Sequence, residues 1–67
     1  MDRLLLPEEV AERVRRPKTT LAFWRTRGIG PKSARVGGRV LYRESDVEQW
    51  ISAQFDLAKA SGGPEAA

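Results

Sequence analysis

The chain has 67 residues, of which 40% are hydrophobic and 31% are charged, and this length allows one small domain with a limited core. It contains neither cysteine nor histidine, which excludes disulfides, thiolate or imidazole metal sites and acid–base catalysis by histidine. We therefore expect no enzyme activity, no cofactor and no metal site. No apolar run approaches the ~20 residues of a membrane span and the N-terminus lacks a signal-peptide pattern, so we expect a cytoplasmic protein.

Charge is distributed very unevenly along the chain. The formal net charge is +3, yet no aspartate or glutamate occurs between Arg13 and Arg43, and ten of the twelve basic residues lie in that segment. Such a block of positive charge is typical of a protein that binds a polyanion. The alternative is a basic surface that is only solvated, because many small basic proteins bind no nucleic acid.

Two helices are predicted in the first half of the chain. The first runs from Pro7 to Val14 or Arg15, since proline suits the first turn and the apolar residues 10, 11 and 14 share one helical face. The second begins at Pro17 or Lys18 and ends before Gly28, a residue that commonly follows a helix. Two helices joined by so short a turn, the second one basic, indicate a helix-turn-helix.

A β-hairpin and a third helix are predicted next. The short β-prone runs Ala34–Val36 and Arg39–Tyr42 flank two glycines, which supply the positive φ angles of a tight turn. The third helix should run from about Glu44 to Lys59, with a capping box in Ser45-x-x-Glu48. We expect a domain over residues 1–60 and a disordered tail over residues 61–67, which are rich in glycine, serine, proline and alanine.

The predicted core collects the apolar residues that fall on the inner faces of these elements. It comprises Leu6, Val10, Ala11, Val14, Leu21, Trp24, Ile29, Val40, Tyr42, Val47, Trp50 and Ile51. The two tryptophans and the tyrosine are assigned to this core rather than to ligand stacking, because each lies on a predicted buried side.

Several segments together resemble a known family. They are LPEEVAERV, TTLAFWRTRGIGP and GGRVLYRESDVEQWI, whose motifs fall in the family's order at the family's spacing over residues 4 to 52. The chain thereby resembles the excisionase-type, MerR-like winged helix-turn-helix DNA-binding domains. The resemblance implies a small α+β fold of three helices with a two-stranded hairpin wing, and a DNA-binding protein without catalysis.

Three functions remain open at this stage. The resemblance implies a phage excisionase, a recombination directionality factor that bends double-stranded DNA and directs a phage integrase toward excision. A small MerR-like or AlpA-like transcriptional regulator is the alternative within the same family, because the fold alone does not separate these roles. An adaptor whose basic face docks an acidic protein belongs to a different class, and salt-dependent DNA binding would argue against it.

Candidate DNA contacts follow from the helical phase and the charges. On the recognition helix they are Lys18, Thr19, Thr20, Ala22, Phe23, Arg25, Thr26 and Arg27. On the wing they are Arg35, Gly37, Gly38 and Arg39, the last of which is the best candidate for insertion into the minor groove. Residues assigned to the DNA backbone are Arg13, Arg15, Arg16 and Lys32.

Two further hypotheses concern the surface. Phe23 is either an exposed aromatic residue that meets DNA or, if the helical phase is shifted, a core residue. The acids that flank the basic segment either form a solvated far face or pair with the basic face of a neighbouring subunit. Such a head-to-tail contact, which would involve Glu44 and Glu48, would generate a filament along DNA.

Overall fold

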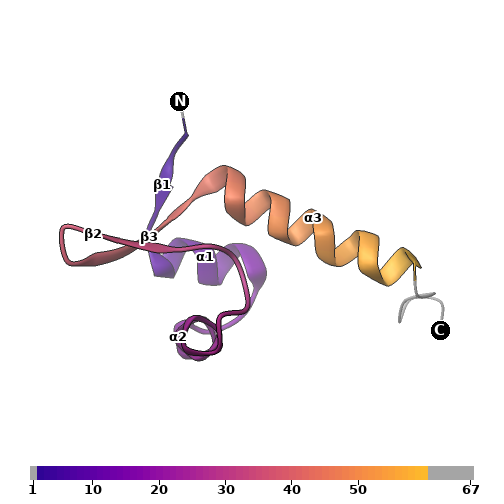
Figure 1. Cartoon of the computed structure of the whole chain (residues 1–67), viewed down its shortest axis with the longest axis horizontal. Coiled ribbons are helices and arrows are strands. Elements are labelled where there is room, and N and C mark those ends of the chain that lie inside the picture. The colour runs from indigo at the N-terminus through magenta and orange to yellow at the C-terminus, as the bar shows by residue number, and fades with distance from the viewer. Residues whose placement is uncertain (1, 61–67) are drawn as a thin grey trace.

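The computed structural model describes residues 2–60 and forms a small α+β winged helix-turn-helix (Figure 1). The predicted tail, residues 61–67, lies outside the described residues. The elements in chain order are β1 (Leu4–Leu5), α1 (Pro7–Val14), α2 (Lys18–Arg27), β2 (Ala34–Val36), β3 (Arg39–Arg43) and α3 (Glu44–Ala60). The three predicted helices and the predicted hairpin are all confirmed.

The connection between α1 and α2 is a tight turn that contains a left-handed residue. Pro7 opens α1, and the Glu9 carboxylate accepts a hydrogen bond of 2.8 Å from the Leu6 N–H just before the helix. At the other end Arg15 adopts φ 59° and ψ 41°, and its N–H donates to the Ala11 carbonyl. This conformation reverses the chain within three residues, and α2 then starts at Lys18.

The sheet has three antiparallel strands in the order β1-β3-β2. Strands β2 and β3 form the predicted wing, and β1 was not predicted. Leu5 of β1 is opposite Tyr42 of β3, so the N-terminal residues form the third strand. Gly37 and Gly38 connect β2 to β3 with φ angles of 60° and 89°, as a two-residue turn with positive φ at both positions requires.

The core is small and lies where the sheet meets α1, α2 and the start of α3. Its fully buried members are Leu5, Val10, Leu21, Tyr42 and Val47. Trp24 packs on Trp50 of α3 with ring centroids 5.2 Å apart. A Cβ on Gly30 would come within 2.8 Å of the Trp24 ring, so the loop after α2 approaches the indole closely.

Two predicted core residues are exposed instead. Leu6 is 38% exposed and Ile29 is 53% exposed. Side chains alternate along a strand, so the core position near the N-terminus belongs to Leu5, which is opposite the buried Tyr42. Ile29 follows the last turn of α2, and its N–H bonds to the Trp24 carbonyl.

The start of α3 is capped from a distance, so the predicted capping box is wrong. The helix begins at Glu44, and Ser45 lies inside its first turn. The Asp2 carboxylate accepts hydrogen bonds from the Ser45 hydroxyl at 2.6 Å and from the Ser45 N–H at 3.1 Å. These hydrogen bonds hold the pKa of Asp2 below its usual value. The N-terminal segment thus fixes α3, which extends away from the wing (Figure 1).

Candidate nucleic-acid interface

The outer face of α2 is exposed along its length. Thr19, Ala22, Phe23 and Thr26 are all exposed, and Phe23 keeps 54% of its surface accessible. The alternative that Phe23 belongs to the core is therefore wrong. The Arg27 guanidinium lies 4.8 Å from the centroid of the Phe23 ring, so the aromatic side chain supports a cation on the helix surface.

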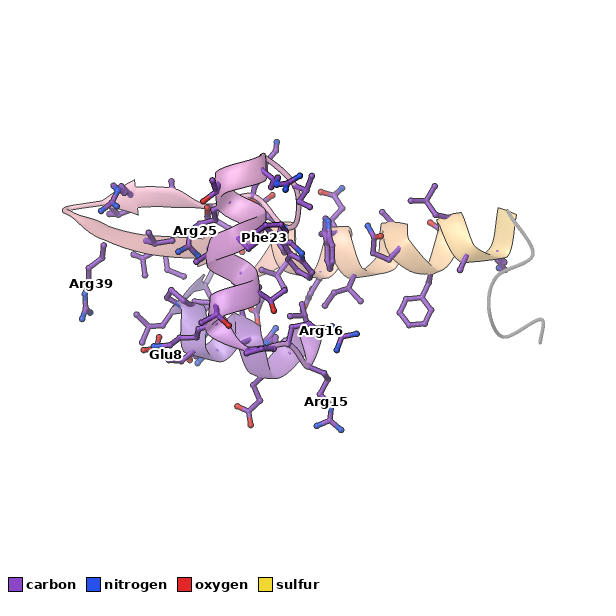
Figure 2. All side chains as sticks on the ribbon, turned by 90° about the horizontal axis from the view of Figure 1, so that it is seen from below. Glu8, Arg15, Arg16, Phe23, Arg25 and Arg39 are labelled. Atoms are coloured by element: carbon purple, nitrogen blue, oxygen red, sulfur yellow. The ribbon has the colours of Figure 1, made fainter. Side chains whose placement is uncertain are left out.

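The turn between α1 and α2 presents two further cations. Arg15 and Arg16 are exposed, and within residues 2–60 neither forms an ion pair. Figure 2 shows both side chains pointing away from the body of the molecule beside the start of α2. Cations at this position can contact DNA phosphates when the neighbouring helix lies in a groove.

The wing carries one arginine on each side of its tip. The Arg35 guanidinium donates to the Gly38 carbonyl at 3.2 Å, which folds the side chain over the turn. Arg35 is opposite Val40 in the ladder, so it lies on the sheet face that carries the helices. The Arg39 side chain extends from the wing toward the side of α1 (Figure 2) and shares a hollow with Lys18 of α2.

Two of the predicted DNA contacts, Arg13 and Arg25, bond to side chains in distant parts of the fold. Arg13 pairs with Glu44 at 2.7 Å and with Glu48 at 3.7 Å, and these ion pairs tie α1 to α3. Arg25 donates a hydrogen bond of 2.8 Å to the hydroxyl of the buried Tyr42. Glu44 lies 31 residues from Arg13, and Tyr42 lies 17 residues from Arg25, so nothing in the local sequence indicates these contacts.

Two more basic residues occupy other positions on the surface. Arg43 pairs with Asp46 at 3.0 Å and so supports the start of α3. Lys32 lines a hollow of about 290 Å³ with Leu4, Val36 and Arg43, on the sheet face that the alternation of side chains turns away from the core. The structure therefore separates Lys32 from the face of α2.

Five cations remain around the exposed side of α2 without a carboxylate partner in the described part of the chain. They are Arg15, Arg16, Arg27, Arg35 and Arg39. They come from the inter-helix turn, the end of α2 and the wing, so positive charge flanks the helix on both sides. The helix itself offers hydroxyl, methyl and aromatic groups. This arrangement suits phosphates at the flanks and base edges at the centre.

Other types of site find little support in the described residues. Within residues 2–60 no three aspartate or glutamate side chains gather in a group that could hold a metal ion. None of the described helices combines the length and the apolar character that a membrane crossing requires.

A comparison with known families gives one result. Residues 4–54 match the family described as "Helix-turn-helix domain", and this match covers both helices, the wing and the first part of α3. No curated protein and no solved structure matches the chain.

Proposed function

The chain belongs to the helix-turn-helix domain family, and we propose that α2 is its recognition helix and enters the major groove of double-stranded DNA. The domain itself indicates sequence-specific DNA binding, since the family includes excisionase-like DNA-binding proteins. The observation that supports this placement best is the group of five cations around the exposed face of α2 that have no carboxylate partner among residues 2–60. Cations whose charge no carboxylate neutralises can replace the counterions of DNA phosphates.

The proposed contacts divide into three groups. Thr19 at the start of α2, with Ala22 and Phe23 one turn further, faces base edges, where the apolar pair can meet thymine methyl groups. Lys18, Thr20, Arg25, Thr26 and Arg27 lie along the same helix, where Thr20 and Arg25 are half-buried and give the DNA less surface. Arg15 and Arg16 contact phosphates, whereas the ion pairs of Arg13 assign it to the fold.

The wing is proposed to follow the adjacent minor groove. Gly37 and Gly38 leave the tip without side chains, so the hairpin can approach the DNA backbone closely. Arg39 is the residue that we place in the groove, because arginine is favoured where the negative potential is concentrated in a narrow minor groove. Arg35, which folds over the turn, would hold the neighbouring phosphate.

The finer proposal is an excisionase-like role, in which the protein bends DNA and directs an integrase toward excision. It is supported by the motifs that resemble excisionases and by a wing suited to a deformed minor groove. A small transcriptional regulator is the second candidate. Nuclease protection of captured fragments of the source DNA separates them: several phased repeats beside an integration core support the first, and a lone site over a promoter supports the second.

Head-to-tail association on DNA remains a prediction, and the structure changes how it should be tested. Glu44 and Glu48 already pair with Arg13 inside the chain, so reversing their charge would also disturb the fold. Asp56 on the exposed end of α3 forms no ion pair among the described residues. Asp56→Lys should reduce cooperative filling of tandem sites, and unchanged cooperativity would argue against an acidic contact through α3.

A further inference from the structure

One acidic residue of α1 lies beside basic side chains of α2 and the wing, because the fold brings these three elements together. Glu8 of α1 comes from outside the acid-free segment, yet its Oε2 lies 3.4 Å from Nζ of Lys18 at the start of α2. Lys18 and Glu8 line an open hollow of about 230 Å³, together with Leu6, Pro7, Arg39 and Val40. Figure 2 shows Glu8 on the side of the molecule toward which Arg39 extends.

Two of the residues that line the hollow are cations that can hold an anion. Lys18 and Arg39 contribute one cation from the recognition helix and one from the wing, and no side chain caps the N-terminus of α2 beside them. The path of the DNA backbone between a major groove that holds α2 and a minor groove that holds the wing runs between these two elements. A phosphate there would meet both cations.

The Glu8 carboxylate is held in its charged form at this position. A hydrogen bond to its own backbone, the hydrogen bond and charge of Lys18 and, to a smaller extent, the charge of Arg39 lower the pKa of Glu8. The ion pair with Lys18 is weak because both side chains are more than half exposed. An external anion therefore competes directly with the Glu8 carboxylate for Lys18.

We propose that the hollow between α2 and the wing binds a DNA phosphate, and that Glu8 competes with this phosphate by pairing with Lys18, which limits sequence-independent affinity for DNA. This inference rests on the proposed function, since it requires that α2 and the wing meet DNA. In the wild-type chain this ion pair keeps Lys18 on the Glu8 carboxylate and away from the backbone phosphates of DNA of any sequence.

The competition should change the salt dependence of DNA binding by an amount that can be measured. Each phosphate contact contributes about 0.9 to the slope of log affinity against log salt concentration. If Glu8→Gln frees Lys18 for one further contact, the slope steepens by about 0.9. The same relation gives a gain in affinity of about eightfold at 0.1 M salt and about fourfold at 0.2 M salt.

The test measures binding of the whole chain to a random-sequence DNA duplex of 20 base pairs at several salt concentrations. Glu8→Gln is compared with Glu12→Gln, which removes the same charge from the same helix at an exposed position without an ion pair among the described residues. We expect the gain and the steeper slope for Glu8→Gln alone. Equal effects of the two variants would overturn the proposal.

A double-mutant cycle tests whether Glu8 acts through Lys18. Glu8→Gln should increase affinity much less when Lys18→Gln is already present, because the competed cation is gone. A gain of the same size in both backgrounds would mean that Glu8 only repels DNA at long range, and it would overturn the competition.

Failure of this inference can be told apart from failure of the proposed function. If the wild-type chain shows no salt-dependent binding to the duplex, the DNA-binding proposal itself fails. If the wild type binds and Glu8→Gln behaves as Glu12→Gln does, only the competitor role of Glu8 fails.

Discussion

Replacing Arg15 by alanine and by glycine should separate the two roles of this residue. Its backbone is left-handed, with φ 59° and ψ 41°, and this conformation costs a residue with a side chain about 1–2 kcal/mol. Glycine avoids that cost but loses about 0.5–1 kcal/mol through the entropy of the unfolded chain. The difference predicts that Arg15→Gly is more stable than Arg15→Ala by about 0.5–1 kcal/mol.

The same pair of variants should bind DNA equally weakly. Both remove one exposed guanidinium that has no carboxylate partner among residues 2–60. The loss of one phosphate contact lowers affinity about eightfold at 0.1 M salt. Arg15→Lys keeps the charge and serves as the matched control, with affinity close to that of the wild type.

Thermal unfolding and a DNA-binding titration measure the two effects. A difference of about 0.5–1 kcal/mol corresponds to a shift in Tm of about 2–8 °C for a domain of this size. A Tm of Arg15→Gly below that of Arg15→Ala would refute the cost assigned to the left-handed backbone at residue 15. The phosphate contact is refuted if Arg15→Ala binds DNA as tightly as Arg15→Lys does.

Three other predictions concern the wing, the core and the pH dependence of stability. Arg39→Ala should weaken DNA binding, with the greatest loss for duplexes whose wing position is rich in A·T pairs, and an unchanged affinity for such duplexes in a binding titration would exclude the minor-groove contact. Trp24→Ala removes the ring that packs on Trp50, which costs about 3–5 kcal/mol, and calorimetry should show no cooperative unfolding at 37 °C; a transition near the wild-type Tm would contradict this core. Because folding lowers the pKa values of Asp2 and Glu8, their stabilisation is present above the unfolded values and is lost as pH falls through the folded ones, so Tm should fall below about pH 4; a Tm that stays constant from pH 7 to pH 3 would contradict it.

The elements that the sequence predicts well carry local signals. Pro7 and Pro17 mark the starts of the first two helices, and the pair Gly37-Gly38 marks the hairpin. Each of these signals constrains only the backbone of its immediate neighbours, so it can be recognised without knowledge of the rest of the fold. The exposure of Phe23 likewise follows from the helical period, because Leu21 and Trp24 face the core and Phe23 falls outside their face of the helix.

The features that the sequence does not predict depend on contacts between distant residues. Strand β1 consists of Leu4 and Leu5 paired with Arg43 and Tyr42, and two apolar residues near a terminus give no local signal for this pairing. The cap of α3 comes from Asp2, which is 43 residues from Ser45. The partners of Arg13 are hidden for the same reason, so the charge pattern overestimates the number of free cations.

The salt dependence of wild-type binding to double-stranded DNA tests the central claim most directly. Five cations around α2 and the wing have no carboxylate partner among residues 2–60, and five phosphate contacts give a slope of log affinity against log salt of about −4.5. A slope near this value, which becomes shallower by about 0.9 in Arg39→Ala, would support α2 and the wing as the DNA-binding face. A flat response to salt, or no binding at 0.1 M salt, would contradict it.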